Sequence, residues 1–416
     1  EKVPSELMRF IQDNMEGNHF YLEEAINSLI DSNTLVLDNG HWRVTKRIRE
    51  ADISATIQGV ISARVDRLEQ ESKRTLQEAS VIGRSFYYEI LKRTTALKNN
   101  IDKNLSSLER VDLIKTKSIQ PDLEYIFKHV LTQEVVYNGL LKKERKKIHE
   151  RIAIVIEQLF QDRIAEFYET LAFHFSRGQS LDKAVSYLMK SAKKSLARYS
   201  VEESHLYYKQ AFELLDRKEN KTNAEKERLI ELLIDWAYVF YYRGYFKEMA
   251  EVLKANKSVA ESLEDKTKIG MYYSWYGWSL GCQNKIADSE PWLEKALKIG
   301  EEINDERVVG YACTWMTWGY LTKGDLAQAI KHGERVQEIS KTFKSDAYLF
   351  FKSLAGLGFT YACCGAKTKA MEVANTLIEY GKKHSNIRSL TMGYACLGNC
   401  YSMDGNLTAA IEACEH

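Results

Sequence analysis

The stretch MTWGYLTKGDLAQAI, residues 316–330, holds the pattern that decides the fold. Its first half carries large residues three or four apart with a small residue among them, and Gly324 separates it from a second half that carries Ala329. Side chains at that spacing lie on one face of a helix, and glycine tolerates the positive φ of a tight turn. The stretch therefore predicts two helices joined by a short turn and packed closely at their small residues.

The same pattern recurs through the C-terminal half of the chain. Five turn residues follow one another at intervals of 40, 40, 41 and 40: Gly244, Asn284, Gly324, Gly365 and Gly405. A column seven residues before each turn holds Ala237, Gly277, Thr317, Gly358 and Gly398, and one five residues after it holds Met249, Ser289, Ala329, Ala370 and Ala410. A fixed period of this length indicates a solenoid of stacked helix pairs.

This repeat resembles the tetratricopeptide pattern, whose usual period is roughly 34 residues. The longer period resembles the longer-helix variant in the sensor regions of bacterial ATPase-type regulators. Two looser units, residues 168–192 and 197–215, precede the regular array. We therefore expect a right-handed solenoid of about seven helix pairs over residues 161–416. Its last pair is cut short, which predicts an excised piece of a longer protein.

Composition supports a mainly helical, cytoplasmic protein. Three prolines in 416 residues are about 0.7%, which excludes a proline-rich linker and disfavours a sandwich or barrel. A net charge of +1 gives no global attraction to nucleic acid or membrane. No apolar run approaches the roughly 20 residues of a membrane-spanning helix. Seven cysteines, all after residue 281, suggest reduced thiols rather than a disulfide framework.

The N-terminal half has a different organisation. Residues 1–38 predict two helices, and a run of shorter helices follows from Ile53 to about Leu159. Within that run, Leu105–Ile114 is the candidate recognition helix and Leu123–Phe127 reads as a strand. Three helices followed by a short two-stranded wing outline a winged helix-turn-helix domain.

Four phrases in this half carry a resemblance to a known family. They are EGNHFYLEE (residues 16–24), SATIQGVISARVDRLEQESKRTLQEASVIGRSF (54–86), LSSLERVDLIK (105–115) and YIFKHVLTQEVVYNGLLKKERKKIHERIA (125–153). Together they resemble the region downstream of the P-loop in signal-transduction (STAND-type) AAA ATPases. The nearest likeness is to bacterial proteins that join a class III adenylate or guanylate cyclase, an ATPase and tetratricopeptide repeats.

The resemblance implies a domain plan of ATPase lid helices (1–52), winged helix (53–160) and repeat solenoid (161–416). It also implies a switch in which ADP, held between ATPase core and winged helix, locks a closed state that ATP exchange releases. Glu16-Gly17-Asn18 matches the family's junction phrase at the lid, although His19 stands where proline is common. His129 resembles the winged-helix histidine that touches the ADP β-phosphate. The alternative for His129 is a strand-end histidine bonded to nearby backbone.

The chain departs from the family in one decisive respect. It contains no G-x-x-x-x-G-K-[ST] motif, so it has no loop to cradle phosphates. We therefore expect no cofactor in this chain, and ATP or ADP with Mg only in an intact parent. The ATPase core that binds them would precede Glu1 and be a partner within the same polypeptide.

The sequence predicts neither catalysis nor a metal site in this chain. G-x-S-x-G occurs once, at Gly277–Gly281, but inside a repeat helix rather than at a strand-to-helix elbow, so Ser279 is not expected to be catalytic. Cys396 and Cys400 lie one helical turn apart without a histidine nearby, which favours packing over zinc binding.

A basic run, Lys142–Arg151, raises DNA binding as an alternative function. The competing interpretation is a solvated helical face with Ile148 and Ile152 turned inward. Because the candidate recognition helix is not basic, phosphate contacts would be few and the sequence disfavours nucleic acid.

One further column of the repeat predicts a binding surface. The residue after the small column is aromatic in four of five repeats: Tyr238, Trp278, Trp318, Phe359 and Asn399. In tetratricopeptide arrays this column lines the concave groove, where it would accept a protein or peptide segment. The alternative is that longer helices close the superhelix and make the column part of the core. We thus expect a regulatory, partner-binding segment, with a DNA-binding regulator or a passive scaffold as alternatives.

Overall fold

The computed structural model describes residues 4, 7–8, 19–38, 40–46, 48, 56–95, 100–342 and 346–415. The chain divides into two compact units, Glu1–Ser191 and Ala192–His416. The predicted junction phrase Glu16-Gly17-Asn18 lies outside the described residues. The domain limits predicted at residues 52 and 160 stay predictions, because the division into two units does not test them.

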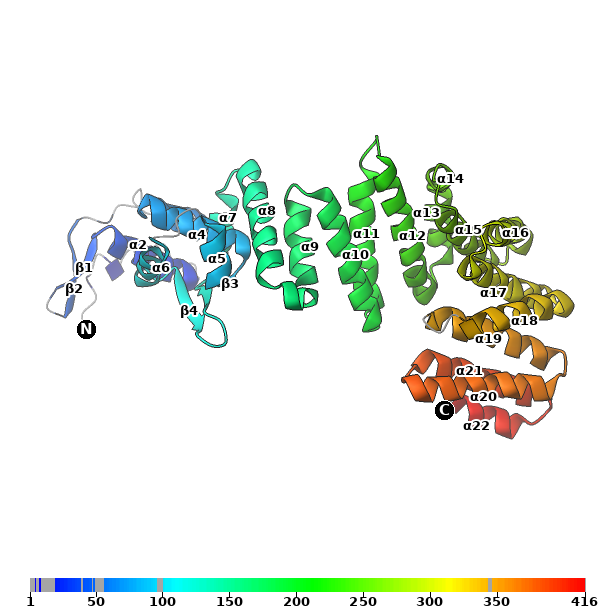
Figure 1. The fold of residues 1–416 in the computed structure, drawn as a ribbon. Helices are drawn as coiled ribbons and strands as arrows, with labels where there is room; N and C mark the ends of the chain where they lie inside the picture. The colour runs from blue at the N-terminus through cyan, green and yellow to red at the C-terminus, as the bar shows by residue number, and fades with distance from the viewer. Residues whose placement is uncertain are drawn as a thin grey trace. The chain divides into compact units, whose positions relative to one another are not determined.

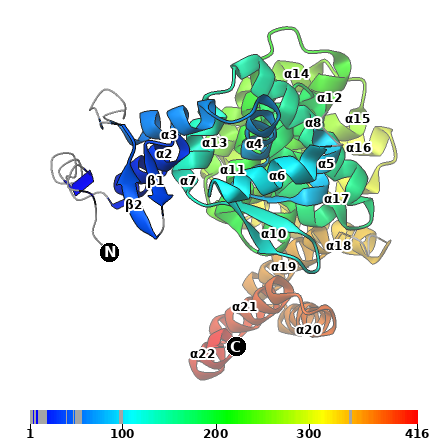
Figure 2. The ribbon, with the colours of Figure 1, turned by 90° about the vertical axis from the view of Figure 1, so that its left-hand side faces the viewer.

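The first unit begins with a helix and a hairpin (Figure 2). Helix α2 (His19–Asp31) precedes strands β1 (Leu35–Asp38) and β2 (His41–Val44), which pair antiparallel. The prediction of helices throughout residues 1–38 is therefore wrong after Asp31. The missed signal is the Asp-Asn-Gly sequence ahead of β2, because Gly40 adopts φ +81°, which a tight hairpin turn requires.

Helices and a three-stranded sheet make up the middle of the first unit. The elements are α3 (Ile57–Asp66), α4 (Gln70–Ile82), β3 (Ser85–Tyr87), α5 (Tyr88–Thr94), α6 (Ile101–Arg110), β4 (Ile114–Ser118), β5 (Glu124–Phe127), α7 (Val130–Asn138) and α8 (Lys142–Leu159). The sheet is antiparallel in the order β3-β5-β4. Strand β5 lies within the predicted strand Leu123–Phe127 and pairs with β4, while β3 is a further strand inside a run for which the sequence predicts helices. The winged-helix assignment stays a prediction.

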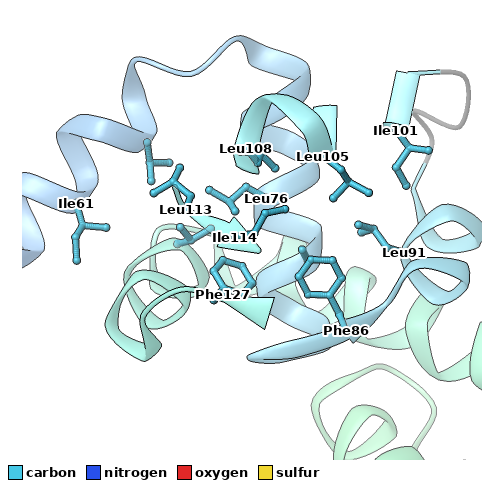
Figure 3. Packing of buried hydrophobic residues seen from close by; sticks show 13 residues of the cluster. Ile61, Leu76, Phe86, Leu91, Ile101, Leu105, Leu108, Leu113, Ile114 and Phe127 are labelled. Carbon is cyan, nitrogen blue, oxygen red and sulfur yellow. The ribbon is translucent and has the colours of Figure 1, made fainter. Parts of the chain in front are cut away.

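The predicted helix Leu105–Ile114 needs a correction at both ends. Helix α6 starts four residues earlier, at Ile101, and stops at Arg110, while Ile114 already belongs to β4. Asp112, at φ +58°, breaks the helix between them. The apolar core of this unit lies between helices and sheet, where Phe86 and Phe127 of the strands pack with Leu105 and Leu108 of α6 (Figure 3).

Helices continue the chain after α8. A short 3₁₀ segment (Gln161–Phe167) leads to α9 (Tyr168–Arg177), α10 (Leu181–Ala197) and α11 (Val201–Asp216). The regular array is α12 (Asn223–Arg243), α13 (Phe246–Ala255), α14 (Lys257–Glu261), α15 (Lys266–Gly281), α16 (Ile286–Glu302), α17 (Glu306–Lys323), α18 (Leu326–Thr342), α19 (Ala347–Cys363), α20 (Lys367–His384), α21 (Ile387–Met403) and α22 (Leu407–Glu415) (Figure 1).

The repeat predicted from the sequence is confirmed at its turns and its contacts. All five turn residues have φ between +61° and +82°, and each separates two helices. Every residue of both small columns is buried. A Cβ placed on Gly277 would lie 2.8 Å from Leu293 of the paired helix, which shows why this position stays small.

Helix caps repeat in the array as well, a feature the sequence interpretation missed. Side chains at the N-caps accept hydrogen bonds from backbone N–H groups in the first turn of α12, α15, α17, α19 and α21, which satisfies donors that a helix start leaves free. These caps are Thr222, Asp265, Asp305, Asp346 and Asn386. The cap column therefore fixes where the first helix of each pair begins.

Pro291 lies inside α16. The helix starts at Ile286, so Pro291 is its sixth residue and removes one backbone hydrogen bond. No helix among the described residues is long and apolar enough to cross a membrane.

Candidate functional site

Five aromatic residues from three helices form part of the interior of the second unit. We call them the aromatic cluster: Tyr272, Trp275, Tyr311, Trp315 and Tyr348. The first four are completely buried, and Tyr348 is 8% exposed. Ring centroids of Trp275 and Trp315 lie 5.5 Å apart, and those of Tyr311 and Tyr348 lie 6.3 Å apart. These five rings therefore serve as core.

The predicted groove column lies at the border of this cluster. All five members are partly exposed, unlike the cluster beside them. Trp278 stacks on Trp315 with ring centroids 4.2 Å apart, and Tyr238 is hydrogen-bonded through its hydroxyl to that of Tyr311. Trp278 and Tyr238 are thus held by contacts with the aromatic cluster while part of each side chain stays exposed.

The remaining members of the column differ in their surroundings. The ring centroids of Trp318 and Phe359 lie 5.7 Å apart, and Trp318 Nε1 donates a hydrogen bond to the backbone carbonyl of Lys352. Asn399 has a buried Oδ1 without a hydrogen-bond partner among the described residues. The structure therefore joins the four aromatic members to one another or to the cluster, and gives Asn399 a separate setting.

Curvature of the array brings distant repeats together. The ring centroids of Tyr238 in α12 and Tyr348 in α19 lie 5.0 Å apart. The Cζ atom of Arg388 in α21 lies 3.3 Å from the ring centroid of Tyr242. These contacts cross several helix pairs. The inner helices of the unit therefore face one another around a shared aromatic interior.

Lys352 is a functional candidate that the sequence interpretation missed. It lies on α19 and is only 5% exposed. Its Nζ donates to the Tyr241 hydroxyl at 2.8 Å and lies 4.4 Å from the ring centroid of Trp318 and 5.8 Å from that of Trp278. Burial lowers the pKa of Lys352 to about 8, partly opposed by Cys282. The signal was a single charge within the apolar run AYLFFKSLAGLGF.

Two of the rings that Lys352 contacts, Trp278 and Trp318, also line a cavity. A cavity of about 250 Å³ is lined by Trp278, Cys282, Trp315 and Trp318, among others. The indole N–H groups of Trp278 and Trp315 are buried and have no acceptor among the described residues. Burial raises the pKa of the Cys282 thiol to about 12, so it is neutral. The site thus offers donors without matching acceptors.

His129 lies in the first unit, at the N-cap of α7 and against α2. Its ring packs on Phe20 with centroids 4.1 Å apart, and Nε2 lies 3.6 Å from a Glu23 carboxylate oxygen. Nε2 is buried without a hydrogen-bond partner among the described residues. The neighbouring Lys128 Nζ binds the carboxylates of Glu23 and Asp112. His129 therefore lies beside carboxylates at the place where the family resemblance implies a phosphate.

A buried ion pair holds α2 in that position. Arg64 of α3 and Glu24 of α2 are 2% and 1% exposed at their side chains, with 2.7 Å between Nη1 and Oε2. Arg64 Nε also binds Asp31 at 2.8 Å, and Nη2 donates to the Val111 carbonyl at 2.6 Å. One guanidinium therefore joins α2, α3 and the end of α6.

The basic run of α8 behaves as one face of a packed helix. Ile148 and Ile152 are completely buried, as the helical-face interpretation expected. Arg151 binds the buried Glu78 at 3.0 Å, and Glu144 binds Arg74 of α4. Some of the charge in this run is therefore used within the unit.

The residues with potential chemistry elsewhere are structural in their settings. Ser279 is completely buried and its hydroxyl donates to the Tyr276 carbonyl within its own helix. Cys396 and Cys400 are buried free thiols, while Cys363 and Cys364 are exposed. In the part of the chain that the structure describes, no three potential metal ligands gather.

Comparisons with known proteins place the fold. Across the whole chain the structure is similar to a Signal Transduction ATPase with Numerous Domains (STAND) protein with a tetratricopeptide repeat sensor from Pyrococcus horikoshii, at 16% identity and a TM-score of 0.58. It is also similar to the apo form of RapI, at 10% identity and a TM-score of 0.50, over 95% of this chain and 94% of that one. The fold is therefore mainly α with a tetratricopeptide-like solenoid.

Sequence comparison reaches less far. An uncharacterized protein of Rhizobium meliloti (strain 1021) is 29% identical over 110 residues, which are 26% of this chain. No family model matches the sequence. The chain spans 56% of the Pyrococcus protein and 10% of the Rhizobium protein.

Proposed function

We propose that this chain is the regulatory, partner-binding segment of a STAND-type signalling ATPase. The observation that supports this most is the similarity of fold along the entire chain to a STAND protein with a repeat sensor. The four sequence phrases of the first half point the same way independently. A nucleotide cyclase as the output domain stays a prediction from the resemblance alone.

In this proposal the second unit is the sensor. The partly exposed column Tyr238, Trp278, Trp318 and Phe359 offers rings that are already held by the core, so little side-chain freedom is lost when a segment of a protein partner packs against them. Binding changes activity only if the partner prefers one of two conformations, and that preference sets the size of the response.

The first unit is the transmitter in the same proposal. The Arg64 ion pairs and the His129 contacts hold α2 on the sheet and helices. ATP or ADP with Mg would bind the ATPase core of the parent protein. Release of α2 would expose His129 Nε2 beside Lys128 for a phosphate oxygen, and covering it again would withdraw that contact.

Nucleotide exchange in the full-length parent protein tests the sensor role. We expect Trp318→Ala together with Phe359→Ala to abolish the response of ADP release to the activating partner, with basal release unchanged. Trp292→Ala is the matched control, because Trp292 is also a partly exposed indole but lies on α16, the second helix of its pair. Full activation of the double variant would overturn the proposed role of the column.

A further inference from the structure

The ammonium of Lys352 is an unusual buried charge. Buried lysines are ordinarily paired with an acid, since desolvation of an ion is unfavourable. Here the contacts of Nζ are the Tyr241 hydroxyl and the faces of Tyr241, Trp278 and Trp318. Rings stabilise a cation only partly. Among the described residues no carboxylate lies within ion-pair distance of Nζ.

Unused hydrogen-bond donors gather beside this cation. Trp278 and Trp315 stack on each other, and both indole N–H groups are buried without acceptors in the described part of the chain. Both rings line the cavity of about 250 Å³, together with Trp318 and Cys282. Lys352 is not one of the lining residues, but its Nζ contacts the faces of Trp278 and Trp318, which are. A cation on two rings of this cavity, together with two unused indole donors, is complementary to an anion with several acceptor sites.

We propose that Lys352 anchors a glutamate or aspartate side chain from an acidic segment of the protein partner. The carboxylate would accept from Nζ and from an indole N–H, and its methylene groups would pack between the Trp278 and Trp318 rings. This inference rests on the proposed partner-binding function and names the chemistry that the partner must carry.

Charge and size select a carboxylate. A single ammonium balances one negative charge, whereas a phosphate would bring a charge near −2 into an apolar surrounding with one cation. The rings of Trp278 and Trp318 contact Nζ and are partly exposed, whereas Lys352 itself is buried. An acidic side chain is narrow enough to pass between rings, and it keeps its peptide backbone outside on the column.

The pairing has a defined pH dependence. The groups that face Nζ are Tyr241 from α12 and the neutral thiol of Cys282 after α15, and Arg388 from α21 acts on the same tyrosine. A carboxylate binds the protonated amine. Affinity should therefore be constant between about pH 6, where the carboxylate is ionised, and the lysine pKa of about 8, and fall by up to about tenfold per pH unit above it.

Two blocked pentapeptides, acetyl-Ala-Phe-Glu-Phe-Ala-amide and its Gln counterpart, test the proposal on the whole chain by tryptophan fluorescence. We expect the Glu peptide to bind about tenfold more tightly at pH 7 and to lose this preference near pH 10. Lys352→Met should remove the preference and still fold, because an apolar residue of similar length suits the site. Lys295→Met, an exposed lysine over Trp292, is the matched control and should keep the preference.

Each outcome separates the two claims. Equal affinity for both peptides, or a Glu preference that survives Lys352→Met, overturns the lysine anchor and leaves the column as a neutral groove. No binding of either peptide up to about 10 mM also counts against the anchor, since a preformed charged site should reach that range. A peptide with a free C-terminal carboxylate and no acidic side chain should bind no better than the Gln peptide. The double variant Trp318→Ala with Phe359→Ala, measured by nucleotide exchange, decides the proposed function separately.

Discussion

The interactions that stabilise the first unit internally differ from those that stabilise the second. In the first, a single buried guanidinium joins three elements, with Arg64 and Glu24 separated by 40 residues in sequence. In the second, the same small-residue contact, turn and cap occur in one helix pair after another. The first unit therefore contains one irregular polar contact that joins several elements, whereas the second repeats the same contacts from pair to pair.

Removing the buried charge should have the largest effect. Arg64→Met leaves Glu24 buried without its cation, and we expect the first unit to lose about 3–5 kcal/mol in urea unfolding. Arg43→Met is the control, because its pair with Asp38 is solvent-exposed and should contribute about 0–1 kcal/mol. A loss below 1 kcal/mol for Arg64→Met would show that the first unit does not depend on this ion pair.

Acid should destabilise the first unit through a second buried polar contact. His149 and His174 are each 1% exposed, with their Nδ1 atoms 2.9 Å apart, and burial lowers the pKa of both. Because the folded pKa values lie below the unfolded value near 6.5, stability is full above that pH and is lost as pH falls toward the folded values.

We expect a decrease of about 2–4 kcal/mol between pH 7 and pH 5 in chemical unfolding. A double variant, His149→Gln with His174→Asn, should retain only the weaker slope from histidines of the second unit, such as His205. If the unfolding free energy depends on pH equally in the variant and the natural sequence, the His149–His174 pair does not cause the acid sensitivity of the first unit.

Two glycines of the second unit should respond in opposite directions to the same change. Gly277→Ala introduces a Cβ 2.8 Å from Leu293, and we expect a loss of about 1–3 kcal/mol. Gly319 also lies within a helix but has no neighbour within 4 Å, so Gly319→Ala should stabilise by about 0.5–1 kcal/mol. Thermal unfolding of both variants measures the difference, and equal effects would mean that the small column is not a contact column.

The repeat was predictable because its signal is local and recurs. Turn, small column and packing face all lie within one period of about 40 residues, and each was read correctly at five places. The hairpin β1–β2 was not predicted, although Asp-Asn-Gly is a typical hairpin-turn sequence. This turn sequence occurs only once and follows a helix, so no repetition strengthens its signal. The exact ends of α6 depended on the unusual φ of Asp112, which no propensity predicts.

The candidate site was predictable only in part. The column Tyr238, Trp278, Trp318, Phe359 could be found by its spacing, and its partly exposed position is compatible with the proposed groove. The importance of Lys352 could not be found that way. Its partner Tyr241 is 111 residues away, and only the curvature of the array brings the two together.

The sequence by itself determined the helices, their pairing and the period, because those follow from contacts between residues close along the chain. Tertiary structure alone decided which aromatics became core, which kept an exposed edge, and which charges were buried. Burial depends on how repeats curve around one another, and the energy of a charge such as Arg64 or Lys352 depends on what surrounds it there. Arg64 contacts carboxylates and Lys352 contacts aromatic rings. Neither set of contacts can be recognised from the residues next to Arg64 or Lys352 in the sequence.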